Sequence, residues 1–290
     1  MESSMVESQF DGLKLHMKKW HVPNAKTVLL IIPGYGDHIE RYDHLIDYLN
    51  KHNVAVVGID LRGQGQSHGE RGYTPHVEAI LDDVATGIEK VHDWYKYLPL
   101  FMYGDGVGAA ILCAFENRRC TMSAPYQGLI LCTPSIAFPK KPNFIHLALV
   151  SASSFLAPHT RAPVLGGDYK YTNDPEIIAA RENDLYYHDR WTAHTCAILI
   201  EEALNLEKVS SKFSVPTLIQ HGSEAFLPME KVQDFVDRAK KRNPNKHEDN
   251  ITFQTWKGFH AELHNDLRRK EVFLYTLSWI ETQLQPLKTA

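Results

Sequence analysis

The 290-residue sequence predicts an α/β fold whose central sheet is mostly parallel. Three observations lead to this prediction. Short, continuous apolar runs recur along the chain, as expected for strands that are buried on both faces. Between them lie segments whose apolar residues recur at spacings of three or four, which is the pattern of amphipathic helices. Repeated alternation of the two patterns favours a parallel sheet with helices on both faces.

The first half of the chain supplies a hairpin, four buried strands and two helices. Asp11 and Gly12 separate two alternating segments, which indicates a β-hairpin. Continuous apolar runs then predict buried strands at residues 27–33, 54–60, 99–103 and 128–134. Helical spacing predicts helices over residues 40–50 and 76–97.

The last third of the chain resumes the alternation. Residues 216–222 and 251–256 are further predicted strands, and residues 267–284 show helical spacing. Together with the hairpin, this gives about eight strands.

Between the two halves the alternation lapses over about 80 residues that contain prolines, an apolar helix-like run and further helical stretches. We therefore expect a core formed by residues 1–134 and 214–290. A helical cap, residues 135–213, would be inserted over the carboxyl edge of the sheet.

The composition excludes several classes of function. A formal net charge of -4 leaves no basic surplus for a phosphate backbone, so nucleic acid is not an expected partner. The four cysteines fit no zinc-binding spacing and include no C-x-x-C pair, so we expect no metal and no cofactor. Their apolar neighbours are typical of small buried side chains in a reducing compartment.

Two segments bear on export and membrane insertion. The first twelve residues are polar and acidic and lack an apolar core, so they do not predict a signal peptide. The most lipophilic run, residues 144–157, is interrupted by a histidine and serines and is shorter than the roughly 20 residues of a transmembrane helix. We expect a cytoplasmic protein without a transmembrane segment, and ordinary packing of this run against the core.

The segment FMYGDGVGAA, residues 101–110, has the outline of a strand–turn–helix elbow that holds a catalytic nucleophile, written G-x-S-x-G. An apolar run leads into Gly104, and Gly106 and Gly108 follow. The middle position of the pattern, where serine is expected, is Gly106. The sequence therefore predicts the backbone of the elbow without its nucleophile.

Five segments in order resemble the monoacylglycerol lipase and lysophospholipase branch of the α/β-hydrolases, whose members are similar to serine aminopeptidases of the S33 type. They are PGYGDHIERYDHL, DLRGQGQSHGERGYTPHVEAILDDV, the elbow, NDPEIIAARENDLYYHDRWTAHT and SVPTLIQHGSE. The likeness covers nearly the whole chain. It implies an α/β-hydrolase fold with a mostly parallel sheet of about eight strands, flanking helices and an inserted helical cap.

The resemblance fails where the catalytic triad of that branch belongs. Its elbow GHSMGG reads GDGVGA here, so the serine position falls on Gly106. Its acid, in the pattern HGxxD, falls on Ala225, and its histidine, three residues after a glycine, falls on Ala261. A one-residue shift of the last loop would bring His260 into that position instead. A hydrolase of this type needs all three groups.

Two further groups of residues belong to this comparison. The oxyanion loop of the branch begins with His-Gly, which is Pro33-Gly34 here, and we expect a vestigial loop formed by Gly34, Tyr35 and Val107. Beside the three triad positions stand Asp105, Glu224 and His260, which could form a residual polar site. Without an attacking atom at Gly106, such a site has nothing to activate.

Three functions remain open at this point. The first is a pseudoenzyme that acts as a structural or interaction subunit with protein partners, in a large cytoskeletal or organellar assembly. The second is a ligand-binding or sensor protein that holds a lipid-like molecule in the pocket. The third is a lipase-type enzyme whose chemistry has moved or whose catalytic residues were replaced.

Overall fold

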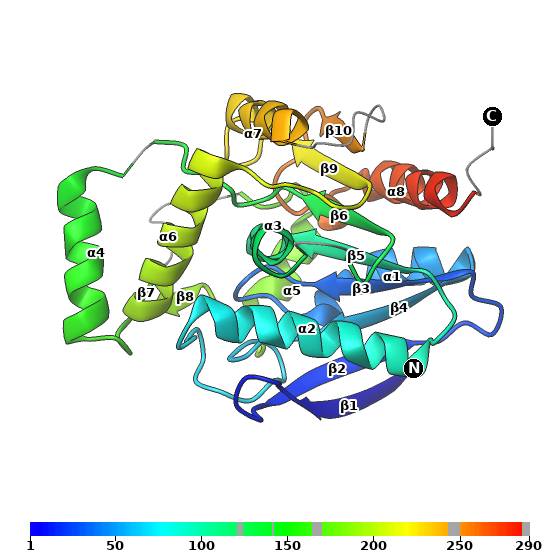
Figure 1. Ribbon diagram of the computed structural model, residues 1–290, viewed down its shortest axis with the longest axis horizontal. Coiled ribbons are helices and arrows are strands. Elements are labelled where there is room, and N and C mark those ends of the chain that lie inside the picture. The colour runs from blue at the N-terminus through cyan, green and yellow to red at the C-terminus, as the bar shows by residue number, and fades with distance from the viewer. Residues whose placement is uncertain (121–123, 141, 164–169, 243–249, 286–290) are drawn as a thin grey trace.

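The computed structural model describes residues 1–290 except 121–123, 141, 164–169, 243–249 and 286–290 (Figure 1). The described residues form an eight-stranded sheet in the order β1-β2-β4-β3-β5-β6-β9-β10. Its strands are β1 (Glu2–Glu7), β2 (Lys14–Trp20), β3 (Thr27–Ile32), β4 (Val54–Ile59), β5 (Leu100–Asp105), β6 (Gly128–Cys132), β9 (Thr217–Gly222) and β10 (Ile251–Trp256). The predicted mostly parallel, eight-stranded sheet is confirmed.

The two N-terminal strands are the antiparallel part of this sheet. β1 and β2 form a hairpin in which Glu7 pairs with Lys14, so Asp11 and Gly12 lie in the turn, as predicted. β2 then pairs antiparallel with β4. From β4 to β10 every neighbouring pair is parallel, so the carboxyl ends of six strands meet along one edge.

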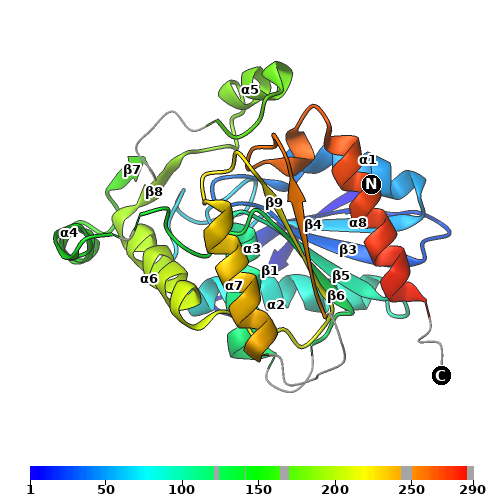
Figure 2. The same cartoon turned by 90° about the horizontal axis from the view of Figure 1, so that it is seen from above.

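Two layers of helices cover the sheet (Figure 2). One apolar cluster joins the sheet to α2 (Val77–Trp94), α3 (Val107–Arg119) and α7 (Met229–Arg242). A second cluster on the other face joins it to α1 (Asp43–Lys51) and α8 (Arg269–Leu284). Because both faces are covered, every residue of β3, β4, β5, β6 and β9 is buried, which explains their continuous apolar runs.

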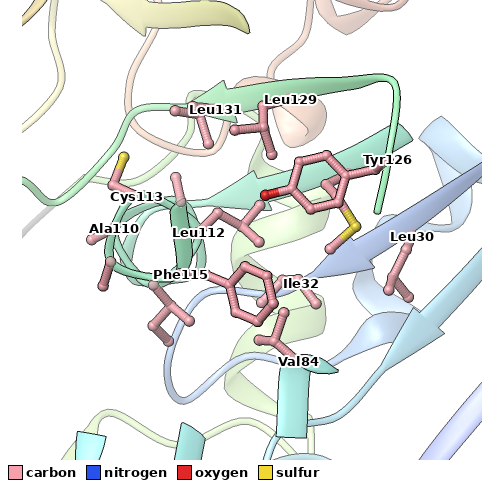
Figure 3. Packing of buried hydrophobic residues seen from close by; sticks show 14 of the residues in the cluster. Leu30, Ile32, Val84, Ala110, Leu112, Cys113, Phe115, Tyr126, Leu129 and Leu131 are labelled. Carbon is pink, nitrogen blue, oxygen red and sulfur yellow. The ribbon is translucent and has the colours of Figure 1, made fainter. Parts of the chain in front are cut away.

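The helix that follows the elbow is anchored in the first cluster. Figure 3 shows side chains of this cluster from several elements, among them Phe115 of α3, Ile32 of β3 and Val84 of α2. Leu112 and Cys113 of α3 have no solvent exposure. Burying a large apolar side chain such as leucine stabilises the fold by roughly 1.5–3 kcal/mol. The middle of α3 is therefore held firmly against the sheet.

Among the described residues, five elements lie between β6 and β9. They are α4 (Phe144–Leu156), β7 (Arg161–Pro163), α5 (Pro175–Glu182), β8 (Arg190–Thr192) and α6 (Ala193–Val209). β7 and β8 pair in a small separate sheet. The segment contacts loops at the carboxyl edge of the main sheet, since His188 N–H donates to Gly36 O and Glu262 N–H donates to Tyr171 O. Its division from the core as a cap domain stays a prediction.

The apolar run of the predicted cap behaves differently from the expectation. It forms α4, which packs along α6 and buries none of its residues completely (Figures 1 and 2). Phe144, Phe155 and Leu156 are 77–85% exposed. The expected packing against the core is therefore wrong for this face, because the helix lies outside the layers that cover the sheet.

Within the described residues, none of the helices is sufficiently long and apolar to cross a membrane.

Candidate functional site

The candidate site lies at the carboxyl edge of the parallel strands. Loops 33–38, 133–135, 223–225 and 257–262 follow β3, β6, β9 and β10, and Gly106 follows β5. Parallel strands in neighbouring positions end at the same edge, which is where open α/β sheets bind ligands. The sheet order places β5 between β3 and β6, so the Gly106 turn is central in this row of loops.

The turn at Gly106 has the backbone of an elbow. Gly106 has φ 52° and ψ -113°, a conformation that side chains with a Cβ rarely adopt, and it is the residue immediately before α3. Because Gly108 has no side chain, α3 can lie very close to the end of β3 and the loop that follows it. A Cβ at this position would stand 2.3 Å from the Ile32 carbonyl oxygen and 2.4 Å from that of Pro33. The strand, the sharp turn and the helix predicted from the sequence are all present.

The space in front of Gly106 is open. A Cβ built there would have only the Ser135 Oγ atom near it, at 4.0 Å. The backbone around the position is tied down, since Gly106 N–H donates to Cys132 O and Ser135 N–H donates to Gly106 O. The elbow thus has room for a side chain at its apex, and the chain places none there.

The residues of the predicted oxyanion loop lie beside the elbow. A Cβ on Gly34 would be 3.7 Å from the Asp105 carbonyl oxygen, so this loop touches the end of β5. The Gly34 amide donates to the Tyr42 hydroxyl at 3.3 Å. The ring of Tyr35 is buried and packs edge-on against Trp191, with 5.1 Å between ring centroids. Val107, the first residue of α3, is half-buried. The role of Gly34, Tyr35 and Val107 as oxyanion donors stays a prediction.

The loop after β9 contains the predicted acid position. Ala225 is half-buried, and its N–H donates to Gly222 O at 3.2 Å. The neighbouring Glu224 is exposed, and its carboxylate accepts a hydrogen bond from the Ser223 hydroxyl at 3.0 Å. Glu224 N–H donates to Phe259 O, which joins this loop to the one after β10.

The loop after β10 contains both candidates for the base position. Ala261 is half-buried. His260 makes two contacts: its Nδ1 lies 3.1 Å from the Glu224 carbonyl oxygen, and its Nε2 lies 3.2 Å from Asn173 Oδ1. Neither contact involves the Glu224 carboxylate or Asp105. The three residues of the predicted residual polar site therefore do not form one cluster. His260 contacts Glu224 only through the Glu224 carbonyl oxygen, and Asp105 contacts neither of them.

Asp105 faces His264, a residue that sequence reasoning did not assign to the site. The Asp105 Oδ1 and His264 Nδ1 atoms are 3.9 Å apart, and the imidazole stacks on the Tyr42 ring at 4.1 Å. Burial raises the pKa of Asp105 well above its usual value, and nearby Glu262 adds to this effect. Burial also lowers the pKa of His264 to about 3. Both groups thus favour their uncharged forms.

A charged cluster lies next to this pair. Glu262 accepts from Arg41 Nη2 at 2.8 Å, and Arg181 of α5 contributes a second pairing at 3.4 Å. Arg41 also pairs with Asp37. Burial raises the pKa of Asp37. Burial would also raise the pKa of Glu262, but the nearby positive charges, chiefly that of Arg41, outweigh this effect and lower the pKa. The cluster ties the loop after β3, the loop after β10 and α5 together.

The sequence contained a signal for these residues. Asp37, Arg41 and Tyr42 belong to the segment PGYGDHIERYDHL, and Glu262 and His264 closely follow Ala261. The first three share a segment with the predicted oxyanion loop and the last two adjoin a triad position, which indicates a location near the site. It does not indicate that they contact one another, because that depends on how the loops approach in space.

Comparison with known proteins places the chain in a family. A family model described as serine aminopeptidase, S33, matches residues 23–266. The chain is 23% identical to a monoacylglycerol lipase of Mycolicibacterium smegmatis over 263 residues, which cover 90% of each protein. It is 23% identical to human monoglyceride lipase over 285 residues, which cover 97% of this chain and 91% of the human one.

A third relative is much longer than this chain. The chain is 22% identical over 281 residues to an uncharacterized abhydrolase domain-containing protein of Dictyostelium discoideum. The match covers 96% of this chain and 29% of the Dictyostelium protein, so the chain spans less than a third of that relative.

Solved structures of other proteins share the fold of this chain. A soluble variant of monoglyceride lipase from Saccharomyces cerevisiae, in complex with a substrate analog, has a TM-score of 0.80 at 19% identity, over 98% of each chain. Monoacylglycerol lipase from Paleococcus ferrophilus has a TM-score of 0.77 at 22% identity, over 93% of this chain and 99% of that one. At such identities the likeness shows the fold, and the predicted α/β-hydrolase fold is confirmed. With the family match over most of its length, the chain belongs to the serine aminopeptidase S33 family, and its resemblance to monoglyceride lipases is confirmed.

Proposed function

We propose that this chain is an α/β-hydrolase whose elbow is catalytically silent and that it serves as an interaction subunit. The observation that carries the proposal is Gly106 at the apex of the elbow, with φ 52° and open space where a nucleophile would stand. The backbone conformation characteristic of a nucleophile position is kept, and the attacking atom is missing. A triad enzyme that loses its nucleophile loses roughly a millionfold in kcat.

The other two triad positions support the same proposal. Ala225 and Ala261 have no group that could orient a base or accept a proton. His260, the neighbour that could replace Ala261, is hydrogen-bonded to Glu224 O and Asn173 Oδ1. A base at this position would have to leave both partners before it could face the elbow.

Ser135 carries the hydroxyl nearest to the apex, which makes it the first candidate for a substitute nucleophile. A serine is a weak nucleophile unless a base lies within hydrogen-bond reach. Across the part of the chain that the structure describes, no histidine nitrogen forms a hydrogen bond with the Ser135 hydroxyl. The nearest elbow carboxyl, Asp105, faces His264 instead.

The outer face of α4 supports the interaction role. Five of its side chains are large, apolar and 62–85% exposed: Phe144, Ile145, Leu149, Phe155 and Leu156. Contiguous exposed apolar surface on a folded protein usually marks a binding surface. The sequence of the helix, FIHLALVSASSFL, contains no Asp, Glu, Lys or Arg that would oppose burial against an apolar partner.

A hydrolysis screen with site mapping tests the silent elbow. We expect no turnover of long-chain monoacylglycerol or lysophospholipid above the rate without protein. We also expect no covalent label from a fluorophosphonate probe on the tryptic peptides that contain Gly106 or Ser135. Turnover that disappears on Ser135→Ala, Asp105→Asn or His260→Gln would show that the chemistry has moved and would refute the proposal.

Binding of a lipid-like molecule over the elbow is a second candidate. It is favoured by the space at Gly106, where a built Cβ would have only the Ser135 Oγ atom within 4.0 Å. A non-hydrolysable monoacylglycerol ether would then raise the melting temperature in proportion to the logarithm of its concentration. A Gly106→Leu variant should lose that shift.

A further inference from the structure

A serine, a histidine and an aspartate form a continuous hydrogen-bonded relay far from the elbow in the sequence. The Ser3 Oγ atom of β1 lies 2.5 Å from His16 Nε2 of β2. The other ring nitrogen, His16 Nδ1, lies 2.9 Å from Asp60 Oδ2 at the end of β4. A nucleophile within reach of a base, with that base oriented by a third group, is the geometry of a catalytic triad.

Asp60 is firmly oriented. It is 1% exposed, and its carboxylate accepts backbone N–H groups from Ile39 at Oδ1 and from Gln66 at Oδ2, each at 2.9 Å. Gly65 packs directly against it, since a Cβ there would lie 2.2 Å from the carboxyl group. The position of this carboxylate is therefore set by the backbone around it.

The orientation of Asp60 decides the tautomer of His16. A carboxylate only accepts hydrogen bonds, so the proton of the neutral imidazole lies on Nδ1. Nε2 then has a free lone pair and accepts the hydroxyl proton of Ser3. The main chain of His16 is held as well, because His16 N–H donates to Ser67 Oγ and Asp60 N–H donates to His16 O. His16 is 3% exposed, and turning its ring away would break the hydrogen bonds of the ring to Ser3 and Asp60.

The nucleophilic end of the relay faces solvent. Ser3 is exposed, while His16 and Asp60 are buried behind it. In the β1–β2 ladder Ser3 is paired with Lys18, so the lysine side chain stands on the same side of the sheet as the hydroxyl. The Lys18 ammonium pairs with Glu40, and it would have to turn from that carboxylate to support a negative charge on an attacked carbonyl oxygen.

We propose that Ser3 is a nucleophilic serine that accepts acyl groups from small activated esters, with His16 as its general base and Asp60 as the positioning residue. Ser3 Oγ bonds to the acyl carbon while its proton passes to His16 Nε2. The bond to the leaving alcohol or thiol then breaks, and that group takes the proton from His16. Water then gives a proton to His16 Nε2 and bonds to the acyl carbon, the bond from that carbon to Ser3 Oγ breaks, and Ser3 Oγ takes the proton back from His16 as the carboxylic acid leaves.

This activity goes beyond the proposed function and does not depend on it. The relay uses β1, β2 and the end of β4, at the antiparallel side of the sheet, whereas the elbow follows β5. The elbow can be inactive while Ser3 is reactive, and the elbow can be active while Ser3 is unreactive. Mapping the labelled peptide separates them.

The test uses the full chain, with any affinity tag at its C-terminus. The protein is treated with a fluorophosphonate probe and, separately, with p-nitrophenyl acetate, and intact mass and peptide mapping locate the adduct. We expect one adduct, on Ser3, and its complete loss in Ser3→Ala. His16→Gln should slow labelling by at least about 100-fold, the usual contribution of a general base.

Ser4→Ala is the matched control, because Ser4 is the next residue of the same strand and points to the other face. It should label at the rate of the unmodified chain. Melting temperatures of all variants establish that they fold, and Ser3→Ala removes little packing because the residue is exposed. No adduct on Ser3 under conditions that label a known serine hydrolase would overturn the proposal. So would equal labelling rates in the unmodified chain and in a folded His16→Gln variant.

Discussion

Asp105 and His264 face each other in the interior beside Gly106, with 3.9 Å between Oδ1 and Nδ1. Among the described residues neither atom has a hydrogen-bond partner. Since burial raises the pKa of the first and lowers that of the second, they meet as two neutral groups and not as an ion pair. A titratable pair therefore lies beside Gly106, the position at which the chain lacks a nucleophile.

Replacing Asp105 by asparagine should stabilise the protein at neutral and alkaline pH. The folded carboxyl holds its proton at pH values where the unfolded one has lost it, so ionisation favours the unfolded state above pH 3.8. Asparagine keeps the shape and cannot ionise. We expect a gain of about 1–3 kcal/mol in the free energy of unfolding at pH 8. The gain should shrink toward pH 4 in urea titrations, and a gain independent of pH would contradict this account.

Substitution of the elbow glycines should separate backbone strain from steric clash. Gly106→Ala meets open space but must adopt a positive φ, so we expect a loss of about 1–3 kcal/mol. Gly108→Ala forces a Cβ against two carbonyl oxygens at 2.3 and 2.4 Å and should cost more than Gly106→Ala. Chemical denaturation of both variants measures the difference. The reverse order would show that the helix can move away from the loop after β3.

Glu262→Ala should strongly destabilise the fold. Glu262 and Arg41 are both buried, and removal of the carboxylate leaves a buried cation that has lost one of its partners. The expected loss is about 3–5 kcal/mol in the free energy of unfolding. Glu271→Ala is the control: it breaks a pair with Arg268 of similar length on the surface, and it should cost less than about 1 kcal/mol. Equal losses would mean that burial of the cluster contributes nothing.

Leu149→Ser on α4 should weaken partner binding without lowering stability. Leu149 is 62% exposed, so its replacement removes little packing from the fold. Leu274→Ser is the control, because Leu274 is 58% exposed and lies on α8, a helix of the core and not of the α4 surface. Quantitative affinity purification should show partners that are depleted several-fold only by Leu149→Ser. If both variants retain the same proteins, α4 is not the binding surface.

Rebuilding the triad should restore weak esterase activity. Gly106→Ser, Ala225→Asp and Ala261→His together should hydrolyse p-nitrophenyl butyrate faster than the starting chain, while no single change should, because the three groups act as a unit. Recovery should be poor, since Pro33 stands where the branch has the histidine of its oxyanion loop, and Asp105 where it has the histidine of its elbow. Adding Asp105→His and Pro33→His should raise the rate further. Vigorous hydrolysis by Gly106→Ser alone would reveal a base and an acid already in place.

Much of the fold could be predicted because local patterns carried it. The hairpin at Asp11 and Gly12, the buried strands and α2 follow from turn chemistry and hydrophobic periodicity, which act over neighbouring residues. The prediction that the apolar run of α4 packs against the core is wrong, because it also rested on a local pattern. The pattern indicates that the helix is apolar, but whether an apolar face contacts the core depends on where the fold places the helix.

The candidate site shows a similar division. Gly106, Ala225 and Ala261 could be named from motif spacing, since each follows a recognisable strand. The division of Asp105 from His260, and the contact of Asp105 with His264, could not be predicted from the sequence. The Asp105–His264 contact joins the last residue of β5 to a residue more than 150 positions further along the chain. The partner of such a side chain is fixed only when β5 and β10 have taken their places in the sheet.

The sequence by itself determined the fold class, the family and the absence of a side chain at the elbow, because these depend on residue identity and short-range order. Only the tertiary structure decided which polar groups meet. Ser3, His16 and Asp60 belong to no common motif in the sequence, and they form a relay because β2 pairs with both β1 and β4. Pairing of strands brings distant side chains within hydrogen-bond distance, and no local pattern encodes that distance.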